Sequence, residues 1–158
     1  MKKPITLLIA DDNQTFRQTI RIAAGESGQI LVVGEATNGE EALELTHQLH
    51  PNVILLNMEI PQLNGIQAVS LINHLCPGCK IITCSVYDSK EVVLAAIRGG
   101  AEGYLVKGSR TAAEIVQAIQ AVAHGLVILS PLMLGWVLDE LTGSTSGSPP
   151  AGEVSCER

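Results

Sequence analysis

Residues 53–56 (Val-Ile-Leu-Leu) form the segment that most limits how this chain can fold. A strand with branched aliphatic side chains on both faces is buried on both sides, which is typical of a parallel sheet covered by helices. The run ends at the polar residue Asn57, and Pro61 and Gly65 then indicate a turn into a new element. In doubly wound sheets the functional site lies at the carboxyl ends of the strands. The sequence therefore predicts a central parallel strand with a site at its carboxyl end.

Four more apolar runs of this kind alternate with segments whose apolar residues recur every three or four positions. That spacing is typical of a helix that covers one face of a sheet. Strict alternation over five units predicts an α/β fold. We expect a doubly wound, five-stranded parallel sheet, flavodoxin-like with strand order 2-1-3-4-5, flanked by helices and followed by one extra C-terminal helix. The expected strands are residues 5–10, 30–36, 53–57, 80–85 and 102–106, and Asp88 is expected to cap the fourth helix.

Charge and hydropathy narrow the class of protein. The chain has 158 residues and a formal net charge of −6, which argues against nucleic-acid binding by its own surface. No apolar run approaches the roughly 18 residues of a membrane span, and the apolar stretch near Met1 is too short for a signal peptide. Four cysteines without a secretory signal predict reduced thiols. We therefore expect a cytoplasmic protein that does not associate with a membrane.

The pattern changes after the fifth unit. We expect residues 1–128 to form the main domain, residues 129–141 an extra linker helix, and residues 142–158 a flexible linker rich in Gly, Ser and Pro. The extra helix has apolar residues on more than one side, because Trp136 lies off the stripe that contains Leu134 and Leu138. Such a helix usually has a partner, so we expect a homodimer that uses this helix or the fourth and fifth helices. The linker leads to no further domain in this sequence, and we expect the domain that it joins to be absent from the chain.

Polar side chains follow four of the expected strands, and in such a sheet those strand ends gather around one pocket. Two adjacent carboxylates with a backbone carbonyl, here that of Glu59, would suit Mg²⁺, which binds few carboxylates and several waters. A hydroxyl and an ammonium group across the pocket would suit phosphoryl oxygens. The side chains of this pocket are Asp11, Asp12, Asn57, Ser85 and Lys107.

These residues resemble the receiver domain of two-component response regulators over about residues 4–125. No single motif is specific, but five motifs in register are. Residues 100–107 and the extra helix with its linker are similar to the NarL/FixJ class. The matching features are the acidic pair (Asp11, Asp12), the loop after the phospho-acceptor (Pro61, Gly65), the switch hydroxyl (Ser85), the switch aromatic residue (Tyr104) and the phosphate-pairing lysine (Lys107).

The resemblance implies a signalling module and not an enzyme. A sensor histidine kinase would phosphorylate the receiver, and a helix-turn-helix output domain would bind DNA and control transcription. Mg²⁺ would be held by Asp11, Asp12 and the Glu59 carbonyl, and the phosphoryl group would recruit Ser85 and Lys107. Tyr104 would then follow Ser85 inward, although a strand aromatic is also an ordinary core residue. We expect the Glu59 carboxylate itself to be solvated.

Asn57 departs from the family, which has an aspartate as phospho-acceptor at this position. An amide carries no anionic nucleophile and cannot form an acyl phosphate. It also removes one anionic ligand of Mg²⁺, so we expect weak Mg²⁺ binding or none. Asn57 is either natural, which makes this an atypical receiver that works without phosphate through dimerisation or protein contacts, or an introduced block of phosphorylation.

Two further alternatives concern other classes of site. A flavodoxin-like small-ligand or phosphatase domain would need a second acid two residues after its aspartyl nucleophile, and Asp11-Asp12-Asn13 lacks that spacing. Cys76 and Cys79 are spaced as in a redox or zinc motif. They follow an expected helix and lead into a strand, whereas a thioredoxin-type pair begins a helix, so we expect a turn there.

Overall fold

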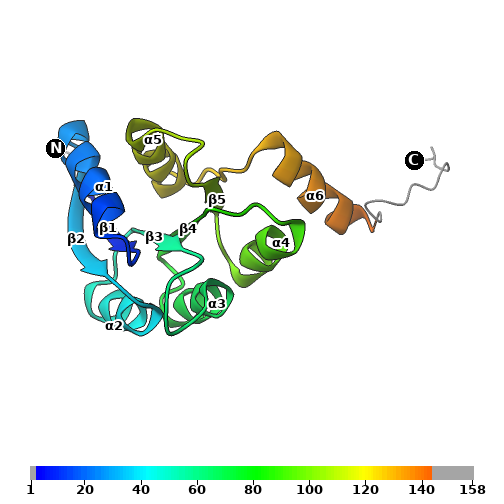
Figure 1. Cartoon of the computed structure of the whole chain (residues 1–158), viewed down its shortest axis with the longest axis horizontal. Helices are drawn as coiled ribbons and strands as arrows, with labels where there is room; N and C mark the ends of the chain where they lie inside the picture. Colours follow the sequence, from blue (N-terminus) through cyan, green and yellow to red (C-terminus); the bar gives the residue numbers. More distant parts are fainter. Residues whose placement is uncertain (1–2, 144–158) are drawn as a thin grey trace.

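The structure, a computed structural model, describes residues 3–143. One sheet of five parallel strands has the order β2-β1-β3-β4-β5 (Figure 1). The predicted α/β class, parallel sheet and strand order are confirmed. The strands are β1 (Ile5–Ala10), β2 (Ile30–Ala36), β3 (Val53–Asn57), β4 (Lys80–Ser85) and β5 (Gly103–Val106).

Helices lie on both faces of this sheet, with α1 and α5 on one side and α2, α3 and α4 on the other (Figure 1). Ser89 caps α4, and not Asp88 as predicted, because the helix begins at Lys90 and the Ser89 hydroxyl accepts from the Val92 N–H. Among the described residues, no helix has both the length and the apolar character needed to cross a membrane. The helices are α1 (Gln14–Ser27), α2 (Gly39–Leu49), α3 (Gly65–Leu75), α4 (Lys90–Gly99), α5 (Ala112–Ala123) and α6 (Pro131–Thr142).

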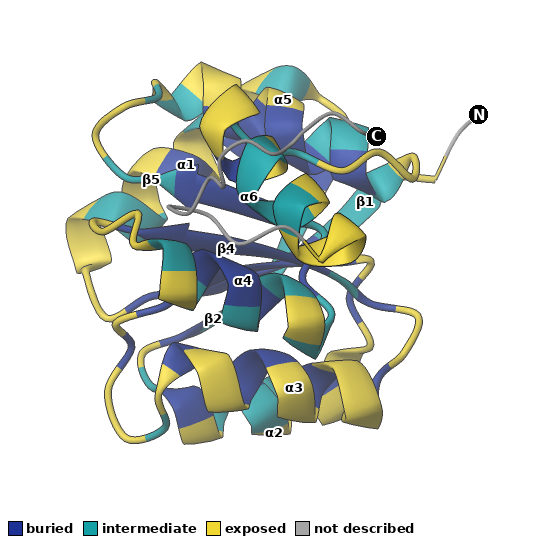
Figure 2. Ribbon diagram, turned by 90° about the vertical axis from the view of Figure 1, so that its right-hand side faces the viewer, coloured by how far each residue is buried: buried dark blue, intermediate teal, exposed yellow. Residues whose placement is uncertain are grey.

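The sheet separates two apolar layers. Side chains alternate along each strand, so Ile54 and Leu56 of β3 pack against α2 to α4, whereas Val53 and Leu55 pack against α1 and α5. All five residues of β3 are buried, as the aliphatic run predicted. Figure 2 shows the buried strands between helices whose outer faces are exposed.

Close backbone approach fixes the loop that follows β3. A Cβ atom at Gly65 would lie 2.5 Å from Met58 Cα, and one at Gly39 would lie 2.5 Å from Leu63 Cβ. Only glycine fits such approaches without backbone movement. The Gly65 N–H donates to the Met58 carbonyl at 3.1 Å, and the Gly39 N–H donates to the Pro61 carbonyl at 2.9 Å. The carboxyl end of β3 is thereby held against the first turns of α2 and α3.

The segment between α5 and α6 extends the edge of the sheet. Ile128 forms an isolated parallel bridge with Gly103, and the Tyr104 N–H donates to the Ile128 carbonyl at 3.0 Å. Helix α6 follows at residues 131–142, close to the predicted 129–141. From residue 144 onward, the predicted flexible linker lies outside the described residues.

Helix α6 packs against α4 of its own domain. Met133 is buried in the core layer on this side and Trp136 is partly buried against it, while Arg98 of α4 pairs with Glu140. Met133 and Trp136 therefore face the domain. The leucines remain exposed: Leu132, Leu134, Leu138 and Leu141.

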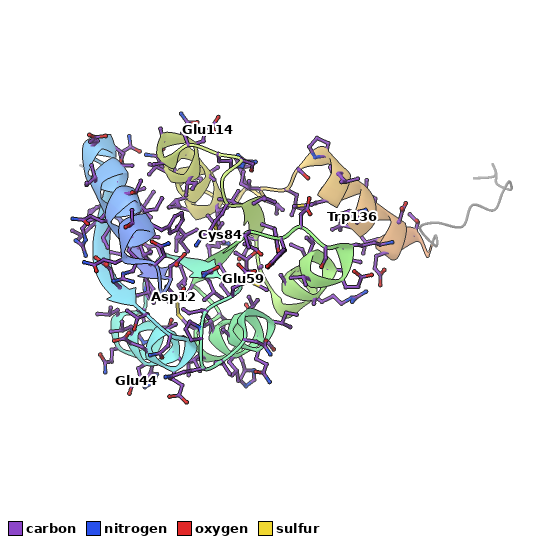
Figure 3. All side chains as sticks on the ribbon, viewed as in Figure 1. Asp12, Glu44, Glu59, Cys84, Glu114 and Trp136 are labelled. Atoms are coloured by element: carbon purple, nitrogen blue, oxygen red, sulfur yellow. A yellow bond between two sulfur atoms is a disulfide. The ribbon has the colours of Figure 1, made fainter. Side chains whose placement is uncertain are left out.

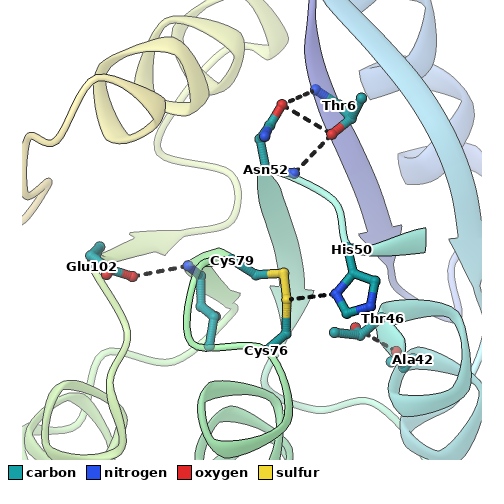
Figure 4. The surroundings of a disulfide bond; sticks show 9 residues. Thr6, Ala42, Thr46, His50, Asn52, Cys76, Cys79 and Glu102 are labelled. Atoms are coloured by element: carbon teal, nitrogen blue, oxygen red, sulfur yellow. Dashed lines mark hydrogen bonds between the residues drawn. A yellow bond between two sulfur atoms is a disulfide. The ribbon is translucent and has the colours of Figure 1, made fainter. Parts of the chain in front are cut away.

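A disulfide joins Cys76 and Cys79 between α3 and β4 (Figure 4). It precedes the first residue of β4, so it lies at the end of the parallel sheet opposite Asn57, the last residue of β3. The predicted turn is confirmed, because the Cys79 N–H donates to the Cys76 carbonyl at 3.0 Å. The expectation of reduced thiols is wrong for this pair. That expectation came from the absence of a secretory signal, whereas the turn itself brings the two sulfur atoms together. His50 Nδ1 lies 3.6 Å from Cys76 Sγ, and Cys84 is a free, buried cysteine.

Candidate functional site

The polar residues predicted for one pocket lie at the carboxyl ends of four strands. Asp11 and Asp12 follow β1, Asn57 ends β3, Ser85 ends β4, and Lys107 follows β5. Backbone hydrogen bonds hold these strand ends level with one another. The Met58 N–H donates to the Cys84 carbonyl at 2.8 Å, and the Lys107 N–H donates to the Ser85 carbonyl at 2.7 Å. In Figure 3, Asp12, Glu59 and Cys84 lie in the middle of the molecule, between the two helical layers.

Asp11 and Lys107 form an ion pair across the pocket. Lys107 Nζ lies 2.6 Å from Asp11 Oδ2, and the Asp11 side chain is 1% exposed. The other carboxylate oxygen accepts from the Asn13 N–H at 2.8 Å. Lys107 Nζ also lies 4.4 Å from the centre of the Phe16 ring, a distance at which a cation–π interaction stabilises the ammonium group. Both charges are therefore fixed in place by the surrounding residues.

Asn57 is buried and uses both ends of its amide. Its Oδ1 accepts from the Glu59 N–H at 3.3 Å, and its Nδ2 lies 3.5 Å from Asp12 Oδ1, at the long limit of a hydrogen bond. A carboxylate at this position could not donate to Asp12. The amide thus adds no negative charge to a pocket that already contains two aspartates.

Ser85 and Glu59 make a contact that the sequence analysis missed. The Ser85 hydroxyl donates to one oxygen of the Glu59 carboxylate, and the Val86 N–H donates to the other at 3.2 Å. Glu59 is an exposed loop residue, as expected, but its carboxylate also makes these two hydrogen bonds, which were not predicted. No sequence signal pointed to the contact, because it depends on how the loop after β3 folds back toward β4.

Tyr104 lies inside the core beside this contact. It is 1% exposed, and its hydroxyl donates to the Tyr87 carbonyl at 2.9 Å. The Tyr87 N–H donates in turn to Ser85 Oγ at 3.0 Å. Burial raises the pKa of Tyr104, and it raises the pKa of the neighbouring Cys84 thiol to about 12. Ser85 is therefore enclosed by buried groups, and the Glu59 carboxylate is the acceptor of its hydroxyl.

Arg17 is a second residue that the sequence analysis did not select. Its guanidinium donates to the Asp11 carbonyl at 2.7 Å and pairs with Glu35 of β2 at 2.8 Å. Burial by itself would raise the pKa of Glu35, but the hydrogen bonds from Arg17 and Arg21 lower it. The spacing of Arg17 and Arg21 on one helix face was the available signal, and these contacts anchor the loop that carries Asp11.

Few oxygen atoms of the pocket are free of other contacts and available to a cation. Within residues 3–143, no group of three or more His, Cys, Asp or Glu side chains could hold a metal ion. Both oxygens of Asp11 already have partners, and Asp12 supplies the remaining carboxylate. The Asn57 oxygen accepts a backbone hydrogen bond. One carboxylate and the Glu59 carbonyl remain as oxygen ligands, so an Mg²⁺ ion bound here would keep several waters.

Comparison with known families matches residues 7–120 to the response regulator receiver domain. The chain is also similar to the nitrate/nitrite response regulator protein NarL of Escherichia coli strain K12. The two are 33% identical over 157 residues, an alignment that covers 99% of this chain and 68% of NarL.

Two solved structures share both fold and sequence with this chain. One is the signal receiver domain of the response regulator NarL from Mycobacterium tuberculosis, with 32% identity and a TM-score of 0.75, covering 78% of this chain and 99% of that one. The other is a LuxR-family two-component response regulator from Aurantimonas, with 26% identity and a TM-score of 0.78, covering 89% of this chain and 99% of that one.

Proposed function

This chain belongs to the family of response regulator receiver domains, and we propose that it is the signal-receiving part of a NarL-type transcriptional regulator. A helix-turn-helix output domain, joined through the segment after α6, would bind DNA, and the receiver itself would not. Response regulators are generally signalling proteins without enzymatic turnover, and we propose the same for this chain, acting in the cytoplasm.

One observation carries the proposal: the Asp11–Lys107 ion pair, Asn57 and Ser85 converge where four parallel strands end. We assign Asn57 to the phospho-acceptor position, Ser85 and Tyr104 to the switch, and Lys107 to phosphate pairing. Asp11, Asp12 and the Glu59 carbonyl would form the metal side of the pocket. Receiver domains generally bind Mg²⁺ at the acceptor site, and here binding is weak or absent because residue 57 adds no charge.

Under this proposal the protein with asparagine at residue 57 cannot be phosphorylated at that position. An amide oxygen has no negative charge with which to attack a phosphorus atom, so no acyl phosphate forms at Asn57. NarL-type receivers interact with histidine kinases, and a sensor histidine kinase would be a phosphodonor for this chain only with aspartate at residue 57.

Intact-mass measurement after incubation with acetyl phosphate and Mg²⁺ tests this assignment. The chain as written should keep its mass, and Asn57→Asp should gain the mass of one phosphoryl group. Asn64→Asp is the matched control, because it makes the same change at the N-cap of α3 and should gain nothing. Label at Asp11 or Asp12 in the chain as written would refute the assignment. A folded Asn57→Asp variant that takes up no label would also refute it.

We further propose a homodimer in which α6 supplies the interface. Met133 and Trp136 occupy the side of α6 that packs on its own domain, which leaves its leucines without a partner among the described residues. Leu134, Leu138 and Leu141 recur at intervals of four and three residues, which places them on one helix face. A second copy of the same face would bury them symmetrically.

A receiver that switches without phosphate is the second candidate function. The contact between the Glu59 carboxylate and Ser85 favours it. The Ser85 hydroxyl, which a phosphoryl group would recruit, already donates a hydrogen bond to this anion. In that case dimerisation or protein contacts, and not a kinase, would set the output.

A further inference from the structure

The Glu59 carboxylate accepts hydrogen bonds from the two donors at the end of β4, the Ser85 hydroxyl and the Val86 N–H. From this geometry we infer that Glu59 is an internal substitute for a phosphoryl group, which holds Ser85 and Tyr104 in their inward arrangement without phosphorylation. The inference rests on the proposed function, because the roles of Ser85 and Tyr104 belong to it.

The arrangement of donors selects an anion. Ser85 is fully buried, and its hydroxyl would lose a hydrogen bond if the carboxylate left. The Val86 N–H points at the same carboxylate, so one charged group satisfies two donors from consecutive residues. Hydrogen bonds to an ionised acceptor are about twice as strong as neutral ones. A carboxylate has two oxygens in one plane and can accept both bonds at once.

The amide at residue 57 makes this position available to Glu59. An aspartate there would place a second negative charge close to the Glu59 carboxylate, and like charges that share a site repel each other. Asn57 carries no charge, and its Oδ1 instead accepts from the Glu59 N–H at 3.3 Å. Lys107 is already paired with Asp11. Glu59 therefore supplies the negative charge that the Ser85 hydroxyl and the Val86 N–H contact.

A chain of hydrogen bonds connects Glu59 with Tyr104. Ser85 Oγ donates to Glu59 and accepts from the Tyr87 N–H at 3.0 Å, and the Tyr87 carbonyl accepts from the Tyr104 hydroxyl at 2.9 Å. Loss of the carboxylate would free the Ser85 hydroxyl to turn and loosen the backbone of residues 86 and 87. The Tyr104 hydroxyl would then lose its fixed acceptor, and the ring could leave the core.

Fluorine NMR of protein labelled with fluorotyrosine tests the inference, because the sequence contains only two tyrosines, Tyr87 and Tyr104. In the unmodified protein the Tyr104 signal should be single and shielded from a soluble paramagnetic agent, whereas exposed Tyr87 should be broadened. In Glu59→Ala the Tyr104 signal should shift and become accessible to the agent. Glu44→Ala, at an exposed position of α2, is the matched control and should leave the signal unchanged.

Two results would overturn the inference. The first is a Tyr104 signal that stays shielded and unshifted in Glu59→Ala. The second is a change of equal size in Glu44→Ala. Circular dichroism of each variant shows whether it is folded. Glu59→Gln adds a test that does not depend on truncation, since it keeps the shape but removes the charge and should shift the Tyr104 signal in the same direction.

A separate arm tests the proposed function independently. The double variant Asn57→Asp, Glu59→Ala is treated with Mg²⁺ and beryllofluoride, which mimics a phosphoryl group on aspartate. If the pocket is a receiver switch, Tyr104 should return to its shielded signal. Failure of this arm counts against the proposed function. If Tyr104 regains its shielded signal here but the Tyr104 signal does not change in Glu59→Ala, only the proposed role of Glu59 is rejected.

Discussion

The Lys107 ammonium lies 2.6 Å from Asp11 Oδ2 and joins the ends of two strands that are not neighbours in the sheet. Between β1 and β5 stand β3 and β4, whose ends carry Asn57 and Ser85. The ion pair thus spans the pocket above them. The Asp11 side chain is almost fully buried, so its charge depends on this partner and on the Asn13 N–H for compensation.

Replacing Lys107 with methionine should therefore destabilise the fold. The substitution keeps the length of the side chain but leaves the Asp11 carboxylate buried without its cation, and it also removes the ammonium above Phe16. We expect the free energy of unfolding to fall by about 3 kcal/mol, as for other buried pairs that lose one partner. Urea titration followed by circular dichroism measures this.

An exposed ion pair provides the contrast. Arg98 and Glu140 are 59% and 47% exposed in their side chains, so Arg98→Gln should change stability by about 1 kcal/mol or less. Equal losses of unfolding free energy in Lys107→Met and Arg98→Gln would contradict the prediction that the buried Asp11–Lys107 pair stabilises the fold more than the exposed pair.

The site was predictable from sequence wherever position on a strand determined it. Asp11, Asn57 and Ser85 were placed correctly because each stands where an apolar run ends, and parallel strands bring those ends together. The contact of the Glu59 carboxylate with Ser85 was not predicted because residue 59 lies in a loop. Which way a loop side chain turns depends on contacts such as the packing of Gly65 against Met58, and these have no periodic signal.

The extra helix shows the same limit in a different form. Ser130 and Pro131 were sufficient to predict where α6 begins, since a cap and a proline at the first helical position act locally. Which side of α6 faces the domain was not predictable, because both sides are apolar. Burial of Met133 and the pairing of Glu140 with Arg98 decide it.

The buried thiol of Cys84 makes stability depend on alkaline pH. Burial raises its pKa from 9.0 to about 12, whereas the unfolded thiol ionises near 9. This contribution to stability is complete below pH 9 and is lost as the pH rises toward 12, by up to about 1.4 kcal/mol per pH unit. Urea titrations at about pH 8, 9 and 10, which run from below this window into its first part, should show a steeper loss in the unmodified protein than in Cys84→Ala. Parallel losses would contradict the prediction.

The dimer proposal predicts that a polar substitution on α6 separates the subunits. Leu138 is 50% exposed, and a second copy of α6 would bury it, so Leu138→Gln should weaken association by about tenfold or more. Leu71→Gln, on α3 with 46% exposure, is the control and should leave association unchanged. Sedimentation velocity at roughly tens of micromolar protein measures the association of both variants. A monomeric unmodified protein, or equal dissociation in both variants, would rule out the α6 interface.

Magnesium binding tests the metal side of the pocket. Asn57→Asp adds an anionic oxygen next to Asp12, and a second free carboxylate with the Glu59 carbonyl approaches the ligand set that Mg²⁺ uses. We expect the affinity for Mg²⁺, measured by isothermal titration calorimetry, to rise by about tenfold or more, which corresponds to about 1.4 kcal/mol. Asn64→Asp makes the same change in net charge outside the pocket and should leave the affinity as it is. If Asn57→Asp and the chain as written bind Mg²⁺ equally, residue 57 does not ligate the ion, and Asp11 and Asp12 lose their assignment to its site.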